Sequence, residues 1–438
     1  MSLQDGFTPK MRPVSPRRSA VVAALDIGTS KIVCLIARLK PQGPQDVLRR
    51  RSHRIEILGL GHTEARGMKA GAVINLAEAE EAVRHAVDLA ERDASVQLES
   101  VVLSLSSSRP SSEFFSVNVN VAGSNVTEGD IARALSAGCN HSVRDGRIVL
   151  HSMPIGYALD GVRGVGEPRG MLAREFGVDM HMVTADFAAA RNLMLVVERC
   201  HLEVETLVAS PYVAGLSAIA DDEADVGAAL IDMGAGTTSM AVFSGGRFTC
   251  ADGFGLGGNN ITMDLARGLN ARISDAERIK TFYGSVLAGG SDERDMISVP
   301  AVSDDDREPP QFVSRASLVR IIKPRVEEIL EMVRDRLAAS PFASEPRARA
   351  IFTGGGSQLT GLPELAARIL NRPVRIGRPL GISGLPEAAK GPAFAVATGL
   401  LVYPQAAHLE HFEPRRTRHL MTGTGYIARV GRWLRESF

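Results

Sequence analysis

VVAALDIGTSKIVCLIARL, residues 21–39, is an apolar run, a polar turn and a second run rich in β-branched residues. This pattern predicts a β-hairpin with Asp26 at its turn. A related pattern, VGAALIDMGAGTTSMAVF, recurs at residues 226–243 and places Asp232 at the corresponding point, 206 residues (232 − 26) after Asp26. The chain therefore contains an internal duplication, with a helix-forming segment at residues 76–93 between the copies. We expect two α/β halves that face each other across a ligand-binding cleft.

Both turns have the composition of a phosphate-binding loop. Glycine lets backbone amides approach a phosphate closely, and hydroxyl groups add hydrogen-bond donors. Two carboxylates at one phosphate chain repel each other unless a cation lies between them, so Asp26 and Asp232 are predicted to hold Mg²⁺, through water. The residues predicted to bind the phosphates are Gly28, Thr29, Ser30 and Lys31 in the first turn, and Gly234, Gly236, Thr237 and Thr238 in the second.

A third glycine cluster, IFTGGGSQLTGLPEL, spans residues 351–365 and has Pro363 near the start of a predicted helix. In the company of two phosphate turns, its backbone is predicted to lie against an adenosine. The alternative is a tight strand-to-helix turn without a ligand. The predicted adenosine contacts are Gly354, Gly355 and Gly356.

Between these motifs, Glu277 and Lys280 stand at i and i+3 spacing on one face of a predicted helix. They are candidates to hold the ribose or the base. The alternative is that the two side chains pair only with each other in solvent.

Composition excludes several classes of protein. Apolar residues make up 45% of the 438 residues and charged residues 23%, which indicates a globular chain with enough apolar material for more than one core. Lys+Arg and Asp+Glu balance at 50 each, so no global field favours nucleic acid. The four cysteines have no Cys-x-x-Cys spacing, which indicates a reducing compartment. Residues 1–18 combine prolines with four cationic residues and are expected to form a disordered leader.

The C-terminal end predicts peripheral contact with a membrane. Residues 406–423 read as a flexible linker, and residues 424–438 end in GYIARVGRWLRESF. A core helix shows a similar stripe, but cationic residues and a tryptophan beyond a linker favour a helix at an anionic lipid interface. On a helical wheel the apolar arc contains Tyr426, Ile427, Val430, Trp433, Leu434 and Phe438, and the cationic residues are Arg429, Arg432 and Arg435.

Three motifs resemble those of a known superfamily. LDIGTSK, IDMGAGTTSMAVF and TGGGSQL are similar to the phosphate-1, phosphate-2 and adenosine motifs of actin, bacterial actin-like filament proteins, Hsp70 chaperones and sugar kinases. Within that superfamily the chain resembles the FtsA family. Further stretches carry this resemblance: LGLGHTEARGMKAGAVINL (58–76), RIVLHSMPIGYALDG (147–161), IIKPRVEEIL (321–330), PVRIGRPLGISGL (373–385) and GRWLRESF at the end.

The resemblance implies an α/β, two-lobed, actin-like ATPase fold that binds ATP and Mg²⁺, without subdomain 1B and with an inserted α+β subdomain, 1C. Strand-like alternation at 101–107 and 116–123, followed by the helix-forming EGDIARALSAGCN, supports an insertion. The expected subdomains are 1A at 19–99 and 177–224, 1C at 100–176, 2A at 225–257 and 342–405, and 2B at 258–341.

The resemblance also implies a function: a cell-division adaptor that polymerises on the cytoplasmic face of the bacterial inner membrane, at the division site. Its partners would be further copies of itself, anionic lipids, later division proteins and the C-terminal peptide of FtsZ. The peptide is expected on subdomain 2B, and the alternative is an exposed ion pair without a partner. The residues that match the docking helix are Arg325, Glu328 and, less directly, Arg315.

One departure from the superfamily bears on hydrolysis. Where chaperones and some bacterial actins place an acid before a proline, this chain reads VASPYVAGL, with Ser210 before Pro211. Without that carboxylate the chain is expected to bind ATP better than it hydrolyses it, and no catalytic residue is assigned. Slow turnover through Asp186, Asn192 or Asp26 acting on a water stays open.

Two other function classes stay in view. An MreB-like cell-shape filament would be expected to carry its membrane anchor near the N-terminus and to keep the acid that Ser210 replaces. A chaperone would need a peptide-binding domain, for which the linker and tail leave no room, and no catalytic-base motif of a sugar kinase is found.

Overall fold

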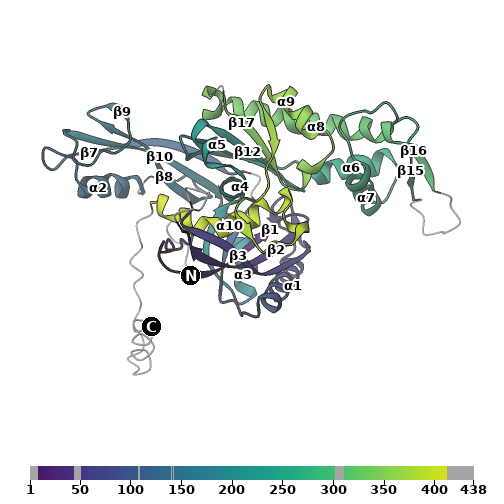
Figure 1. Cartoon of the computed structure of the whole chain (residues 1–438), viewed down its shortest axis with the longest axis horizontal. Coiled ribbons are helices and arrows are strands. Elements are labelled where there is room, and N and C mark those ends of the chain that lie inside the picture. Colours follow the sequence, from purple (N-terminus) through teal and green to yellow (C-terminus); the bar gives the residue numbers. More distant parts are fainter. Residues whose placement is uncertain are drawn as a thin grey trace.

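The computed structural model describes residues 8–43, 51–106, 109–139, 141, 143–300, 310–345 and 347–411. The first lobe contains a six-stranded sheet of order β11-β6-β1-β2-β3-β19 (Figure 1). Strand β2 is antiparallel to both of its neighbours, β1 and β3, whereas β6 and β11 continue the sheet in parallel with β1. The strands are β1 Ala20–Ile27, β2 Lys31–Pro41, β3 His53–Glu64, β6 Ser100–Leu105, β11 Glu203–Ala209 and β19 Ile382–Ser383.

The second lobe repeats this arrangement. Its five-stranded sheet has the order β14-β13-β12-β17-β18, with three antiparallel strands followed by two parallel ones. The internal duplication predicted from the two hairpin patterns is therefore confirmed. The strands are β12 Ala228–Met233, β13 Thr238–Ser244, β14 Arg247–Phe254, β17 Arg349–Thr353 and β18 Val374–Ile376.

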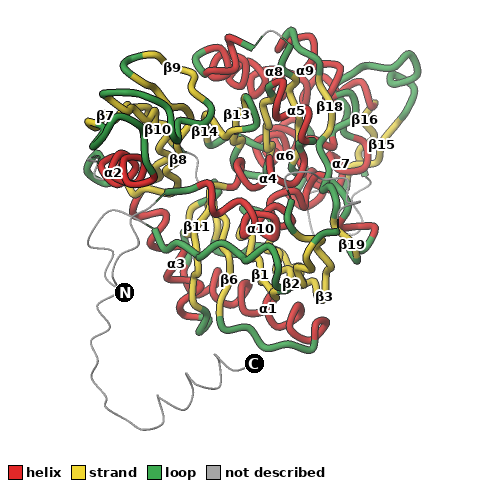
Figure 2. The backbone as a smooth tube through the Cα atoms, turned by 60° about the vertical axis from the view of Figure 1, so that its left-hand side comes forward, coloured by secondary structure: helices red, strands yellow, loops and turns green. Residues whose placement is uncertain are grey.

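Helices cover both faces of the first sheet, which is why β1 and β2 read as nearly continuous apolar runs. Figure 2 shows α1 and α3 on one side of these strands and α10 on the other. The α1 helix lies so close to β3 that a Cβ atom added to Gly61 would lie 1.7 Å from the carbonyl oxygen of Ala86. The helices are α1 Leu76–Ala94, α3 Phe187–Arg199, α4 Ser210–Ala218 and α10 Ala395–Ala406.

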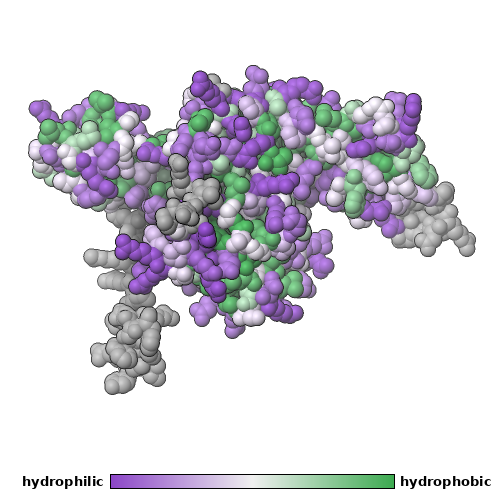
Figure 3. Space-filling model, in the orientation of Figure 1, coloured by the Kyte–Doolittle hydropathy of each residue, from purple (hydrophilic) through white to green (hydrophobic). Residues whose placement is uncertain are grey.

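The stretch predicted as subdomain 2B forms the right-hand arm in Figure 1. One face of the long helix α8 lies in its core and includes Leu318, Ile322 and Ile329. Figure 3 shows this arm and the insert at the left projecting to opposite sides of the central body. The second lobe's other elements are α5 Asp221–Val226, α6 Gly258–Gly268, α7 Ile273–Tyr283, β15 Met296–Val299, β16 Gln311–Ser314, α8 Arg315–Ala338 and α9 Leu362–Leu370.

The insert is an α+β unit with a sheet of order β7-β10-β8-β9 and its own apolar core. The predicted bounds of 100–176 are wrong at both ends, because residues 100–105 form β6 in the first lobe and β10 runs on to Asp186. The β6 strand is buried on both faces, so its apolar residues belong to a central parallel strand. The elements are β7 Ser111–Asn120, α2 Glu128–Cys139, β8 Arg147–Leu159, β9 Val162–Val165 and β10 Glu175–Asp186.

Residues 8–18 and 406–411 pack against the body of the protein, which the sequence did not predict. Residues 8–18 were expected in a disordered leader, yet Thr8 is 4% exposed and bonded to Val149. Residues 406–411 were expected in a flexible linker, yet the side chain of Glu410 is 2% exposed. Buried polar contacts hold both stretches, and such long-range pairings leave no local pattern. The predicted amphipathic helix at 424–438 lies outside the described residues.

Across the described ranges, no helix combines the length and apolar character required to cross a membrane.

Candidate functional site

The two predicted phosphate turns have the same backbone geometry. The amide of Gly28 donates to the carbonyl of Lys31 at 2.9 Å, and the amide of Gly234 donates to the carbonyl of Thr237 at 2.9 Å. Each aspartate stands one residue before the end of its strand, Asp26 in β1 and Asp232 in β12. The duplicated sequence therefore builds two equivalent turns, one in each lobe.

These turns meet where the lobes come together. A Cβ atom added to Gly236 would lie 2.7 Å from the hydroxyl oxygen of Thr29 and 3.0 Å from the Cα atom of Ala70. Such distances leave no room for a side chain. The second turn therefore reaches the first only because residue 236 is glycine.

The third glycine turn lies directly against Asp232. Strand β17 runs parallel to β12 with Thr353 opposite Asp232, and Gly354 follows with φ of +83°. A Cβ atom at Gly354 would lie 2.4 Å from a carboxylate oxygen of Asp232, and one at Gly356 would lie 2.9 Å from the carbonyl oxygen of Met233. Gly355 has open space around it. All three glycine motifs therefore converge on one place.

The two aspartates lie in surroundings that oppose their ionisation. Burial and, after it, the charge of Asp26 raise the pKa of Asp232 to about 7, opposed by the charge of Lys31. Burial also raises the pKa of Asp26, opposed by a hydrogen bond from Ser104 and by the charge of Lys31. Two buried carboxylates that repel each other fit Mg²⁺, which is held in proteins by one or two carboxylates together with water and phosphate oxygens.

Lys31 contacts the segment before α10, which was predicted as part of subdomain 2A (342–405) but packs with the core of the first lobe. Its ammonium donates to the carbonyl of Ala393 and lies 4.0 Å from the centre of the Phe394 ring. Burial lowers the pKa of Lys31, opposed by the charges of Asp26 and Asp232. The carbonyl of Pro392, in the same short segment, accepts from the amide of Gly354 at 3.1 Å. The segment 392–394 therefore contacts both the first turn and the third.

Two contributors escaped the sequence analysis. The hydroxyl of Ser104 donates to Asp26 Oδ1 at 2.7 Å, and the amide of Gly71 donates to the hydroxyl oxygen of Thr29 at 3.1 Å. Gly71 follows Ala70 (φ +46°) in the tight turn between β4 (Met68–Lys69) and β5 (Ala72–Val73). A lone serine in the apolar run VVLSL and the Ala-Gly pair were the signals present in the sequence.

The remaining predicted ligand residues are the pair Glu277 and Lys280 on α7 and the hydroxyl residues of the two turns. Lys280 Nζ donates to Glu277 at 2.6 Å and to the carbonyl of Gly258 at 3.2 Å, and the Gly258 amide donates to Gly234 at 2.9 Å. Lys280, and with it Glu277, is thus linked to the second turn through the backbone of Gly258. Thr238 is buried and donates to a backbone carbonyl, Thr237 is also buried, and Ser30 is exposed at the tip of the first turn.

Ser210 lies at the same edge of the first sheet as Asp26. Strand pairing places Val208 opposite Ser104, whose hydroxyl donates to Asp26, and Ser210 follows Val208 by two residues as the first residue of α4. Its hydroxyl is buried without a hydrogen-bond partner among the described residues. The position that holds an acid in some members of the superfamily therefore holds a small neutral side chain here.

Comparison with known proteins agrees with this architecture. The family model for Cell division protein FtsA matches residues 229–399, and the model for the SHS2 domain inserted in FTSA matches residues 107–184. A Cell division protein FtsA of Agrobacterium fabrum is 48% identical over 437 residues, covering 98% of both chains. The Escherichia coli K12 protein of that name is 31% identical, covering 95% of this chain and 98% of its own. The chain belongs to the FtsA family.

Solved structures place this FtsA-family chain within the actin-like fold. The PilM–PilN type IV pilus biogenesis complex matches with a TM-score of 0.59 at 18% identity, over 88% of this chain and 98% of that chain. MreB5 of Spiroplasma citri bound to AMPPNP matches with a TM-score of 0.52 at 14% identity, over 91% and 98%. At these identities the likeness concerns the fold alone.

The predicted partner residues of this FtsA-family chain lie on α8 but do not form one cluster. The guanidinium of Arg325 donates to Glu328, one turn further on, and to Asp264 of α6 at 2.6 Å. Arg315 begins the helix about 15 Å away along its axis and faces Asp292 at 3.9 Å. Arg325 and Glu328 are thus brought together, whereas Arg315 is separate from them.

Proposed function

We propose that this chain is an ATP-binding, actin-like adaptor of bacterial cell division. It polymerises on the cytoplasmic face of the inner membrane, holds FtsZ filaments there at the division site and helps to recruit later division proteins. Family membership supports the division role. The observation that carries the nucleotide part is the convergence of three glycine turns on the paired carboxylates Asp26 and Asp232.

Each part of the convergence has a task in holding a nucleotide. Backbone amides of the two hairpin turns donate to phosphate oxygens. The hydroxyl of Thr29 already accepts from the Gly71 amide, so its own hydrogen is available to donate to a phosphate. Lys31 supplies positive charge, and Mg²⁺, when bound, neutralises the charge that phosphates and aspartates share. The MreB5 structures of Spiroplasma citri, with the same fold, are bound to ADP and to AMPPNP, which supports a nucleotide here.

The nucleotide acts mainly as a conformational switch. Ser210 provides no carboxylate to orient a water, so hydrolysis is at most weak. The nucleotide instead bridges the turns of both lobes, since Gly28 and Gly234 belong to different sheets. Closure of the lobes around it favours one arrangement of the arms, and thereby polymerisation.

Attachment to the membrane comes from the C-terminal residues 424–438. A single amphipathic segment with six apolar side chains binds lipid reversibly. A polymer aligns many such segments on one surface, and the summed attachment exceeds each single affinity by orders of magnitude. Polymerisation and membrane residence therefore reinforce each other, which is what an adaptor for FtsZ filaments requires.

The test is calorimetric titration of ATP with and without Mg²⁺. Asp26→Ala and Asp232→Ala should each weaken binding, or remove its Mg²⁺ dependence, by tenfold or more, which is about 1.4 kcal/mol. Asp335→Ala, an exposed carboxylate on α8, is the matched control and should bind as the wild type does. Unchanged affinity in both site variants would overturn the nucleotide assignment.

A further inference from the structure

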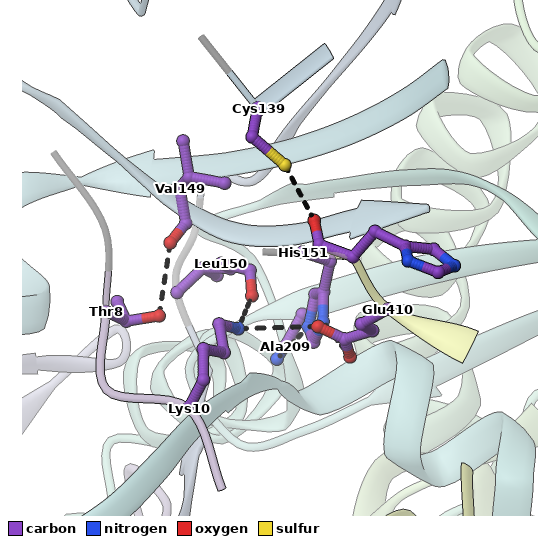
Figure 4. Close-up of polar contacts among 9 residues, drawn as sticks. Thr8, Lys10, Cys139, Val149, Leu150, His151, Ala209 and Glu410 are labelled. Atoms are coloured by element: carbon purple, nitrogen blue, oxygen red, sulfur yellow. Dashed lines mark hydrogen bonds and ion pairs between the residues drawn. The ribbon is translucent and has the colours of Figure 1, made fainter. Parts of the chain in front are cut away.

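The N-terminal residues 8–18 form a strap along the C-terminal end of the described chain. The hydroxyl and the amide of Thr8 donate to the carbonyl of Val149 at 3.1 and 3.2 Å, and the Val14 amide donates to Pro404 at 3.2 Å. Lys10 donates to the carbonyl of Leu150 and pairs with Glu410 at 3.5 Å (Figure 4). Because Lys10 meets Glu410 and Val14 meets Pro404, the two segments run antiparallel.

The strap and the end of the C-terminal segment are held by a buried network. His151 Nε2 accepts from the amide of Ala209 at 3.0 Å, so the ring proton resides on Nδ1, which donates to Glu410 at 2.8 Å. The amide of His411 donates to the carbonyl of Ser152 at 2.9 Å, and the thiol of Cys139 donates to the carbonyl of His411. The point at which the chain continues toward residues 412–438 is therefore fixed beside the strap.

The outer side of the strap is cationic. Arg12, Arg17 and Arg18 are exposed, and none of them forms an ion pair with another described residue. Residues 8–20 contain no acid. The backbone carbonyl of Arg18 accepts from His53 Nε2 at 2.9 Å, so the backbone is held while the guanidinium groups face solvent. Because the backbone is already held, these guanidinium groups, which have no ion pair among the described residues, give up only side-chain freedom when they meet an opposite charge.

We propose that the strap is a second membrane contact, in which Arg12, Arg17 and Arg18 bind anionic lipid headgroups next to the start of the C-terminal tail. The inference rests on the proposed attachment of residues 424–438 to the membrane. Fifteen residue steps from His411 to Tyr426 span at most about 50 Å. The strap therefore stays within that distance of the surface once the tail has bound, and its contact becomes intramolecular.

Charge and position favour lipid over other anionic partners. The tail carries its own arginines beside an apolar arc, so both ends of the chain present the same charge to one surface. Each basic residue near an anionic membrane contributes roughly fivefold in affinity. Three residues that reach the surface only in part should together contribute at least tenfold.

The experiment compares two full-length triple variants in sedimentation with vesicles. One is R12Q/R17Q/R18Q, and the other is R267Q/R278Q/R320Q, which removes the same charge from exposed positions on α6, α7 and α8 in the opposite arm. On vesicles of equal parts phosphatidylglycerol and phosphatidylcholine, the strap variant should bind at least tenfold more weakly than the control variant. The difference should vanish at high salt and on phosphatidylcholine alone. R12K/R17K/R18K should restore binding.

The outcomes separate this inference from the proposed function. Wild-type protein that fails to bind the anionic vesicles contradicts tail-mediated attachment itself. Wild-type protein that binds, with equal affinities for the two triple variants, overturns the strap alone. Equal weakening on neutral and anionic vesicles also overturns it, because a headgroup charge is then not what the strap recognises.

Discussion

At the scale of single residues, the contact between the lobes depends on an absent side chain. Gly236→Ala would place a methyl group 2.7 Å from the Thr29 hydroxyl and 3.0 Å from backbone of Ala70. Backbone cannot rotate away as a side chain can, so the two turns must separate. We expect ATP affinity to fall at least tenfold in a calorimetric titration.

The control for this substitution is Gly123→Ala in the insert, where nothing lies within 4 Å of the new Cβ atom and φ is not positive. It should leave ATP affinity unchanged. An unaltered ATP affinity for Gly236→Ala would mean that the turns do not need their present spacing to hold the nucleotide.

His181 gives the insert a dependence on pH. Burial lowers the pKa of His181 to about 3, from 6.5 in the unfolded chain. Below pH 6.5 His181 is protonated in the unfolded chain but stays neutral in the native protein. Acid therefore favours unfolding. The free energy of unfolding should therefore fall by about 1.4 kcal/mol for each pH unit between these values on account of His181.

The contribution of His181 can be isolated by difference. His181→Gln removes this titrating group. The free energy of unfolding, measured with urea between about pH 4 and about pH 6, should therefore change less steeply with pH than in the wild type. His85→Gln, on the exposed face of α1, should keep the wild-type slope. Equal slopes for His181→Gln and the wild type would show that His181 takes up its proton at the same pH in the native insert as in the unfolded chain.

At the scale of elements, the sequence predicted those helices, hairpins and turns whose formation depends on residues close together in the chain. The two hairpins, the helices α1 and α2 and the turn before α9 could all be located from apolar periodicity and glycine spacing. The insert's limits could not, because β6 and β7 both read as strands and nothing local shows that they join different sheets. The ordered state of residues 8–18 depends on partners such as Glu410, 400 residues away from Lys10.

The candidate site shows the same division. Asp26 and Asp232 stand out because each belongs to a repeated motif. Ser104, Gly71 and Phe394 reach the site through strand pairing and loop packing, and a single serine, glycine or phenylalanine carries no signal of that pairing. Sequence alone also could not show that Arg315 and Arg325 face different acidic partners, Asp292 and Asp264, which come from other segments of the chain.

The helix α8 has a double role that complicates any test of partner binding. Arg325 donates to Asp264 through two nitrogens, at 2.6 and 3.3 Å, and thereby links α8 to α6. Arg325→Glu should abolish binding of the FtsZ C-terminal peptide in a fluorescence titration. It should also lower the free energy of unfolding by about 1 to 3 kcal/mol, because Asp264 then faces a like charge.

A second variant separates these effects. Glu328→Lys leaves the link between Arg325 and Asp264 in place and reverses the neighbouring charge. It should therefore weaken binding of the peptide with little loss of stability. Arg334→Glu, exposed further along α8, is the matched control and should bind the peptide normally. If both Arg325→Glu and Glu328→Lys retain binding, the peptide docks elsewhere.

At the scale of the whole molecule, the insert contacts both lobes. Its strands β8 and β10 lead into the first lobe, while His181 bonds to the carbonyl of Phe248 in β14 at 3.0 Å. The hydroxyl of Ser112 accepts from the amide of Ala251, also in β14, at 2.7 Å. A change in the angle between the lobes must therefore move the insert or break these bonds. The insert, at the left of Figure 1, is therefore tied mechanically to the angle between the lobes.

The C-terminal tail, by contrast, should be separable from the nucleotide site. The described chain ends at His411, where buried contacts of Glu410 with His151 and Lys10 hold the preceding residues to the body. Trp433→Glu would force a charge into the lipid boundary and remove the chain's only tryptophan from the apolar arc. Binding to anionic vesicles should therefore collapse in a sedimentation assay, while ATP affinity measured by calorimetry stays unchanged because the fixed residues 406–411 isolate the body from the tail. Parallel loss of ATP binding, or full sedimentation of the variant, would instead indicate that residues 424–438 form a helix docked on the core.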